Sequence, residues 1–456
     1  MNIQIMHAAT TSYRKTIVAS SVAGLAVIAV TYAGQTLVSA ILPVWFVVLL
    51  TALGWVVGLL LLLVALGGLL VDFRYSGRER GEEDLFLALN RARSEAVSLD
   101  QTGRSKAVRF PRLRRWLGAP AYIVNDTVRI RSLQEILATL DANGCLDGLP
   151  FMPEMAKYCG TVGTVFRCVD KIYDYGGRKD MRRLKDTVSI AGLRCDGSAH
   201  DGCQAKCYLL WKTAWIKRTE VPATSGVEPS VEQAGAVVSD IGIDRSFGPT
   251  FVKDDDAADG RYVCQYTQLV RASTRMRPLD PRQDLRPLIA GNLRVTAFGV
   301  AMLTRLFNAV QRLRGGIGFP PMYHGSSTAS RHVDLNLQPG ELVRVCDPEK
   351  IFETLNPSGR NRGLWFDRGM LSYCKRWYRV LSRIDKIIDD ASGRMLRMKT
   401  PCIVLEGVDA SGEHVRFLAQ HDYPFWREAW LERVDPRAQP DASTPNRSLH
   451  PGNGHR

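Results

Sequence analysis

Residues that could bind a metal gather in one short stretch of the chain, LRCDGSAHDGCQAKCYLLW at 193–211. Thiolate and imidazole groups are the ligands that zinc prefers, and a closed zinc site needs four of them. The stretch and one cysteine upstream supply five candidates: Cys195, Cys203, Cys207, Cys159 and His200. We therefore predict a zinc site in this part of the chain.

Two other interpretations of these cysteines stay open. The spacing of Cys203 and Cys207 is Cys–x3–Cys, which differs from the paired Cys–x2–Cys of zinc knuckles. A reactive thiol is one alternative, and small buried cysteines that only pack are the other.

The chain contains an internal duplication. Residues 128–172 and 343–387 align without a gap at an offset of 215, and 16 of the 45 aligned positions are identical. The same offset aligns LLWKTAWIKR at 209–218 with PFWREAWLER at 424–433. Such a long common register indicates two copies of one folding unit.

The second copy is a control for the cysteine stretch. Cys195, Cys203 and Cys207 fall opposite Ala410, Leu418 and Asp422. A metal site would therefore be special to the first copy. Tyr158–Cys159 and its counterpart Tyr373–Cys374, and the Trp pairs that recur four residues apart, are interpreted as core.

Each copy has the pattern of a small, mostly β unit. VRIR and VRV alternate like half-buried strands, SLQEILATL and DPEKIFETL are typical of capped short helices, and ANGCLDG and PSGRNRG are typical of turns. We predict an α+β, mostly β fold with two tandem SH3-like β-barrel-type repeats. Between the copies, RYVCQYTQLVRAST at 261–274 is predicted as a strand and 292–316 as an amphipathic helix.

The N-terminal part has the composition of a membrane anchor. Residues 16–71 contain no Asp, Glu, Lys, Arg or His, which is long enough for two membrane-spanning helices, predicted near 16–33 and 44–71. A cleaved signal peptide is the alternative for the first segment. Cations flank both ends of the block, which places the termini in the cytoplasm by the positive-inside rule.

The formal net charge of +14 predicts a negatively charged partner. The nearest candidate is an anionic lipid surface, because a basic segment at 104–116 follows the predicted anchor. Six cations would contact lipid there: Arg104, Lys106, Arg109, Arg112, Arg114 and Arg115. A solvated linker is the alternative, and tethering to a membrane argues against nucleic acid.

The predicted layout therefore has six parts. They are two transmembrane helices (1–72), a basic juxtamembrane linker (73–124), the cysteine-rich first repeat (125–220), an inter-repeat loop and helix (221–338), the second repeat (339–435) and a disordered tail (436–456).

Several motifs, CDGSAHDGCQAKC with WKTAW and GRNRGLWFDRGMLSYC above all, resemble a family of uncharacterised bacterial membrane proteins with a duplicated domain. The resemblance covers most of 125–435 and implies a link to cell-surface polysaccharide or related export. It implies no catalytic residue.

The sequence contains no phosphate-binding loop and no nucleophile elbow. We predict a bacterial inner-membrane, multi-pass protein whose cytoplasmic part binds a protein partner as an adaptor. The alternative is a metal-dependent or thiol enzyme that acts on an envelope precursor through Cys195, Cys203 and Cys207. Whether the chain is an enzyme stays undecided, with binding favoured.

Overall fold

The computed structural model describes part of the chain in detail. The described residues are 18–28, 58, 62, 116–175, 177, 179–219, 247–253, 260–278, 280–320, 322, 325, 332–410, 412, 416–418 and 422–434. The chain divides into two compact units, one of residues 1–96 with 295–325 and one of residues 97–294 with 326–456. Both copies of the duplicated sequence belong to the second of these units.

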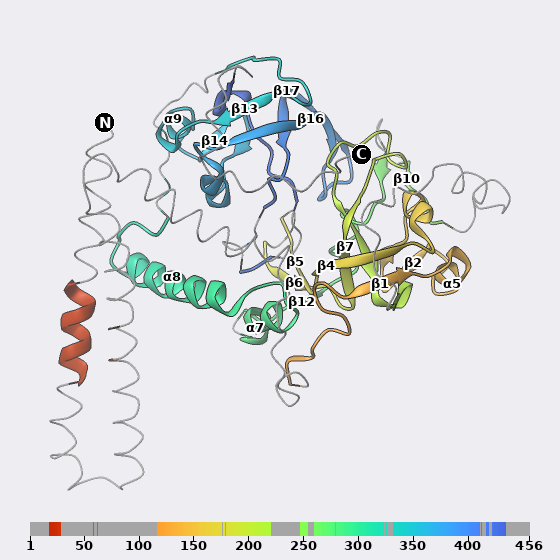
Figure 1. The fold of residues 1–456 in the computed structure, drawn as a ribbon, viewed down its shortest axis with the longest axis horizontal. Coiled ribbons are helices and arrows are strands. Elements are labelled where there is room, and N and C mark those ends of the chain that lie inside the picture. Colours follow the sequence, from red (N-terminus) through yellow and green to blue (C-terminus); the bar gives the residue numbers. More distant parts are fainter. Residues whose placement is uncertain are drawn as a thin grey trace, which may run out of the picture. The chain divides into compact units, whose positions relative to one another are not determined.

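The first copy is built around an antiparallel five-stranded sheet in the order β8–β7–β4–β1–β9. Figure 1 labels three of these strands, β7, β4 and β1. Its strands are β1 (Thr127–Ile130), β4 (Val162–Cys168), β7 (Thr187–Arg194), β8 (Tyr208–Lys212) and β9 (Ile216–Arg218). The other elements of this copy are α5 (Leu133–Leu137), β2 (Cys145–Leu146), β3 (Leu149–Pro150), the 3-10 helices η2 (Pro153–Tyr158) and η3 (Thr213–Trp215), β5 (Lys171–Tyr173) and β6 (Met181–Arg183).

The second copy has an antiparallel four-stranded sheet in the order β17–β16–β13–β18. Its strands are β13 (Leu342–Val345), β16 (Trp377–Ile388), β17 (Met395–Leu405) and β18 (Leu431–Arg433). The remaining elements are α9 (Pro348–Glu353), β14 (Arg360–Asn361), β15 (Leu364–Trp365), and the 3-10 helices η5 (Arg368–Tyr373) and η7 (Glu428–Trp430).

The two copies have the same elements at the same offset of 215 residues. β1, β2, β3, β9, η2 and η3 correspond residue by residue to β13, β14, β15, β18, η5 and η7. The strand register repeats as well, because Val128 pairs with Gly163 and Arg218 while Val343 pairs with Tyr378 and Arg433. The strands and short helices predicted from the alternating and capped sequence patterns are therefore confirmed.

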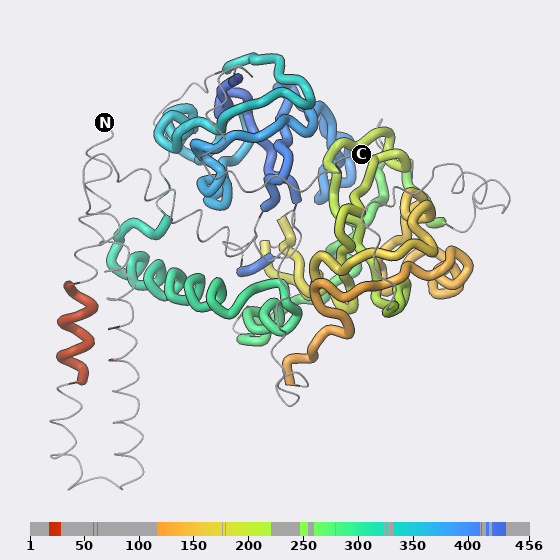
Figure 2. Tube along the Cα trace, in the orientation of Figure 1, coloured from red at the N-terminus to blue at the C-terminus, as the bar shows by residue number. Residues whose placement is uncertain are grey.

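The sheets curl, and each has the form of half a barrel (Figure 2). A register shift between Val165 and Arg167 in the β4–β7 pair recurs between Val380 and Ser382 in the β16–β17 pair. Such bulges bend a strand and increase its twist. The fold is thus mixed α and β with strands prominent.

Aromatic side chains form the same core in both copies. Phe151 lies edge-on to Trp215 with ring centroids 5.3 Å apart, and Phe366 lies edge-on to Trp430 at 5.3 Å. The other pair of tryptophans, Trp211 and Trp426, is also fully buried. The interpretation of these tryptophans as core is confirmed.

The segment that follows the first copy packs onto it. It contains β10 (Phe251–Val252), β11 (Arg261–Tyr262), β12 (Thr274–Arg275) and α7 (Arg282–Ile289). The predicted strand over 261–274 is wrong, because most of 263–273 forms turns in which backbone N–H groups bond to carbonyls three or four residues back. This segment covers the edge of β8 without pairing to it as a strand. The side chain of Gln265 bonds to the Leu210 N–H and carbonyl there, in place of a backbone.

The unit of residues 1–96 and 295–325 contains a helix at 18–28 and α8 (Val295–Leu313), which confirms the predicted helix within 292–316. Among the described residues, no helix is both long and apolar enough to cross a bilayer. Apart from 18–28, Gly58 and Leu62, the segment predicted to hold two transmembrane helices lies outside the described residues. The basic linker up to Arg115 and the tail from 435 onward lie outside them too.

Candidate metal centre

The loop between β7 and β8, residues 195–207, is closed by its own backbone. The Cys195 N–H donates to the Cys207 carbonyl at 2.8 Å, and the His200 N–H donates to the Gly197 carbonyl at 3.0 Å. Gly197 has a φ of +78°, and a Cβ on it would collide with the Cys203 carbonyl. The glycine is therefore required for the loop to fold back and bring Cys195 and His200 to one side.

The 3-10 helix η2 supplies a third side chain. Pro153 begins this helix and fixes its first turn, so that Glu154 follows directly at a position that is 6% exposed. A carboxylate placed that deep requires a partner. The loop of residues 195–207 provides it.

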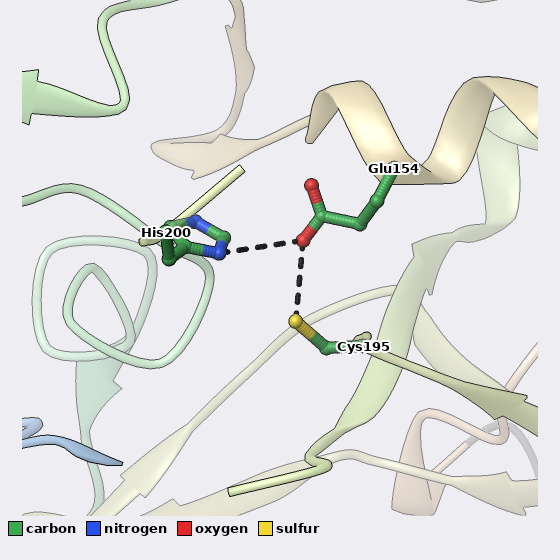
Figure 3. A group of neighbouring side chains, drawn as sticks. All are labelled: Glu154, Cys195 and His200. Carbon is green, nitrogen blue, oxygen red and sulfur yellow. Dashed lines mark hydrogen bonds and ion pairs between the residues drawn. The ribbon is translucent and has the colours of Figure 1, made fainter. Parts of the chain in front are cut away.

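Glu154, Cys195 and His200 converge on one point (Figure 3). The Cys195 thiol donates to Glu154 Oε1 at 3.3 Å, and His200 Nδ1 lies 3.6 Å from the same oxygen. The side chains of His200 and Glu154 are each 1% exposed. One possible ligand atom from each of the three residues lies within 4.8 Å of the others.

These separations fit a shared metal ion. Zinc bonds of about 2.0–2.3 Å at tetrahedral angles place neighbouring ligand atoms roughly 3.4–3.6 Å apart. A sulfur, a nitrogen and a carboxylate oxygen are a donor set that zinc accepts. His200 Nε2 and Glu154 Oε2 are buried without a hydrogen-bond partner in the described structure. The group could therefore hold a metal ion and still has unsatisfied polar atoms.

The Cys195 thiol is held in its neutral form when no ion is bound. Burial, helped by the negative charge of Glu154, raises its pKa well above the usual range. A thiolate nucleophile needs the opposite shift, so this environment does not activate Cys195 for covalent chemistry. A metal ion would displace the thiol proton when it binds.

The other three cysteines predicted as ligands do not join this group among the described residues. Cys203 Sγ accepts a hydrogen bond from the Ile388 N–H at 3.3 Å, in the second copy. Cys207 and Cys159 pack against the core of the first copy. Burial raises the pKa of Cys159 to about 12 and that of Cys207 well above its usual value.

Glu154 was missed by sequence reasoning, which considered cysteine and histidine only. The alignment of the two copies contains a signal that could have found it. At the offset of 215, Glu154, Cys195 and His200 fall opposite Gly369, Ala410 and Val415. All three ligand-type residues are replaced together by residues that cannot bind a metal.

The described residues of the second copy keep two backbone features of this loop. The Ala410 N–H donates to the Asp422 carbonyl at 3.0 Å, as Cys195 does to Cys207. Gly412 has a φ of +63°, and a Cβ on it would collide with the Leu418 carbonyl. These two features therefore form in the second copy without the three ligand-type residues.

The six cations predicted to contact lipid, between Arg104 and Arg115, lie outside the described residues. Trp116, directly after them, is described and is 54% exposed.

No family model matches the sequence, and no curated protein or solved structure is similar to the chain.

Proposed function

We propose that this chain is a binding protein whose first repeat is held together by a zinc ion on Glu154, Cys195 and His200. The observation that carries the proposal is the buried convergence of these three side chains, with two of their polar atoms unsatisfied. Because the group is almost fully buried, the ion would add folding energy to the first repeat, and its fourth position would be completed by a water molecule or another group.

Other residues of the same loop contact the second copy. The Gln204 side-chain oxygen accepts hydrogen bonds from the backbone N–H groups of Asp385 at 2.7 Å and Lys386 at 3.1 Å. The Lys386 ammonium donates to the Asp201 carbonyl. An ion that fixes this loop would therefore also fix how the two copies dock.

We also infer the fold type of the repeats, their partner and their location in the cell from the sequence. Each copy is an SH3-like barrel unit, and the two together serve as an adaptor for a protein partner. The uncharged block at 16–71 anchors the protein in a bacterial inner membrane, with the repeats in the cytoplasm. There the basic segment 104–116 contacts anionic lipid, and the reducing compartment keeps the ten cysteines as thiols.

Metal analysis of the purified full-length chain tests the zinc site. We expect about one zinc per chain for the wild type and almost none for Cys195→Ala, which carries the residue found in the second copy. Cys346→Ala is the matched control, because Cys346 is 5% exposed in the second copy and belongs to no ligand group among the described residues.

Cobalt gives a readout that does not depend on yield. Co²⁺ bound to the site would show a sulfur-to-metal charge-transfer band that disappears in Cys195→Ala and persists in Cys346→Ala. Equal zinc content in the wild type and Cys195→Ala, or a cobalt spectrum without a sulfur band, would overturn the proposal.

A further inference from the structure

In the first copy, a glutamine side chain occupies a defined receptor at the edge of the sheet. The Gln265 carboxamide accepts a hydrogen bond from the Leu210 N–H at 2.8 Å and donates to the Leu210 carbonyl at 2.8 Å. Its nitrogen also lies 3.1 Å from the Pro150 carbonyl and 3.4 Å from Met155 Sδ. We call these four groups the carboxamide socket, and Gln265 in it is 3% exposed.

Every group of the socket recurs in the second copy. Three of the four are backbone atoms, so their chemistry does not depend on the side chain, and at the offset of 215 they belong to Phe425 and Trp365. The fourth is a methionine sulfur in both copies. Met155 Sδ accepts from a backbone N–H three residues earlier at 3.4 Å, and Met370 Sδ does the same at 3.4 Å.

The backbone that carries these groups is equivalent at two places. β3 and β15 correspond residue by residue. Leu210 lies in β8 beside Trp211, which pairs with Val188, and Phe425 precedes Trp426, which forms an isolated antiparallel bridge with the equivalent residue Ile403.

The second socket has no occupant in the part of the chain that the structure describes. Among the described residues, no group donates to the Phe425 carbonyl or accepts from its N–H. The apolar rim of the socket is also less covered, because Leu149 and Leu210 are 0% exposed whereas their counterparts Leu364 and Phe425 are only half-buried. Trp365, the counterpart of Pro150, is 59% exposed.

We propose that the second copy binds a segment of a partner protein through this socket, and that the segment inserts a glutamine side chain. The residues after Gln265 show what else the segment needs. Tyr266, Leu269 and Ala272 are all buried in the first copy's core, at intervals of three residues. The partner segment therefore carries glutamine followed by an aromatic, an aliphatic and a small residue on one face of a turn.

The chemistry of the socket selects glutamine. It offers one backbone donor and two carbonyl acceptors, so that a ligand group must accept and donate at once. A carboxylate can only accept and an ammonium can only donate. Asparagine has the same amide but is shorter by one methylene group, and it would reach the Phe425 backbone only if the partner chain approached more closely.

A peptide with the sequence of residues 261–275 is a suitable probe, because it already fits the first socket. We expect it to bind the purified full-length protein in a fluorescence anisotropy titration. Peptides with glutamate or leucine in place of the glutamine should bind on the order of tenfold more weakly, since each leaves a socket group unpaired. These peptide variants leave the protein unchanged and cannot disturb its folding.

A peptide with a photoreactive benzophenone in place of Tyr266 tests where on the protein the peptide binds. We expect cross-links to 360–370 or 423–427. Cross-links to 145–155 or 208–212 alone would mean that the peptide only displaces the chain's own segment, and would overturn the proposal. So would equal affinities for the glutamine and glutamate peptides, or no binding.

A protein variant completes the test. Leu364→Asp places a charge on the rim of the second socket and should abolish binding, whereas Leu396→Asp, at a site that is 51% exposed on β17, should not. Circular dichroism and a thermal melt establish that both variants fold. Zinc content plays no part in these measurements, so the socket and the metal centre can fail independently.

Discussion

Arg194 and Asp409 occupy the same position in the two copies, 215 residues apart, and they form an ion pair at 2.7 Å. The Arg194 guanidinium also lies 3.7 Å from the ring centres of Tyr208 and Tyr423, which are again equivalent residues. Contacts between equivalent positions are expected where a two-fold axis passes between two units. Equivalent residues of the two copies therefore meet at their contact, as they do in an isologous dimer.

Two further contacts across this interface involve equivalent lysines. Lys386 of the second copy donates to the Asp201 carbonyl in the first copy's loop. Its equivalent, Lys171, lies 6.0 Å from the ring centre of Phe417 in the corresponding loop of the second copy. A lysine from each copy thus lies beside the other copy, Lys386 at the loop of residues 195–207 and Lys171 at Phe417.

The position of Arg194 predicts that it stabilises the docking of the copies. Replacing it by alanine leaves Asp409, whose side chain is 21% exposed, without its cation and removes the contact with both tyrosine rings. We expect Arg194→Ala to lower the free energy of unfolding by roughly 3 kcal/mol, as for a partly desolvated pair that loses one partner. Urea denaturation followed by tryptophan fluorescence measures this change.

The control is an exposed ion pair. The side chains of Arg131, just before α5, and Glu135, in its first turn, are 35% and 41% exposed, so Arg131→Ala should cost less than about 0.5 kcal/mol. Equal effects of the two substitutions would contradict a special role for Arg194.

The duplication predicts paired effects in the two cores. Trp215 Nε1 donates to Thr139 Oγ1 at 3.0 Å, and Trp430 Nε1 donates to Thr354 Oγ1 at 2.9 Å. Thr139→Val or Thr354→Val keeps the shape but leaves a buried indole N–H unpaired, which costs about 1–3 kcal/mol. We expect similar losses for both variants in urea denaturation. A large loss in only one copy would show that the two cores are not energetically equivalent.

Much of this fold could be predicted from the sequence because the copies share one register. The offset of 215 residues located the strands, the short helices and the buried tryptophans of both copies. The interface between the copies could not be predicted, because residues such as Arg194 and Tyr208 meet their partners only through tertiary packing. The segment after Tyr262 was predicted as a strand because its apolar residues suit one, but the side chain of Gln265 satisfies the strand edge instead.

The candidate metal centre was predicted in part. Because cysteine and histidine are common zinc ligands, the sequence analysis selected Cys195 and His200. Both belong to the group that could hold an ion. Cys203 and Cys207 lie in the same loop but point to the second copy and to the core, and sequence spacing carries no information on that direction. Glu154 comes from a helix 41 residues away from Cys195 and is brought in only by the fold.

A partly buried carboxyl group near the interface predicts a pH dependence of stability. Burial raises the pKa of Asp422 to about 6, with a contribution from Asp409, while Tyr266 and Arg194 act in the opposite direction. In an unfolded chain an aspartate titrates near pH 3.9.

Proton binding determines whether the free energy of unfolding rises or falls with pH. Between about pH 4 and pH 6 the folded protein holds more of the Asp422 proton than the unfolded chain does, so its free energy of unfolding falls as pH rises. We expect urea midpoints to decrease from pH 4.5 to pH 7, and Asp422→Asn to flatten this decrease by raising the midpoint at pH 7. A midpoint that rises with pH in the wild type, or an unchanged slope in Asp422→Asn, would contradict this account.

The two glycines of the equivalent loops separate folding from metal binding. Gly197 and Gly412 both have positive φ values, of 78° and 63°, and in both a Cβ would collide with a backbone carbonyl. Substitution by alanine therefore strains either loop, and we expect Gly197→Ala and Gly412→Ala each to cost on the order of 1–3 kcal/mol. Only the first loop carries Cys195 and His200, so only Gly197→Ala should also lose zinc, measured per folded chain by metal analysis. Because the strain is the same in kind, zinc loss in both variants would mean that the ion depends on the whole interface and not on the loop of residues 195–207. Retention of zinc in Gly197→Ala would mean that the ion is not held by that loop.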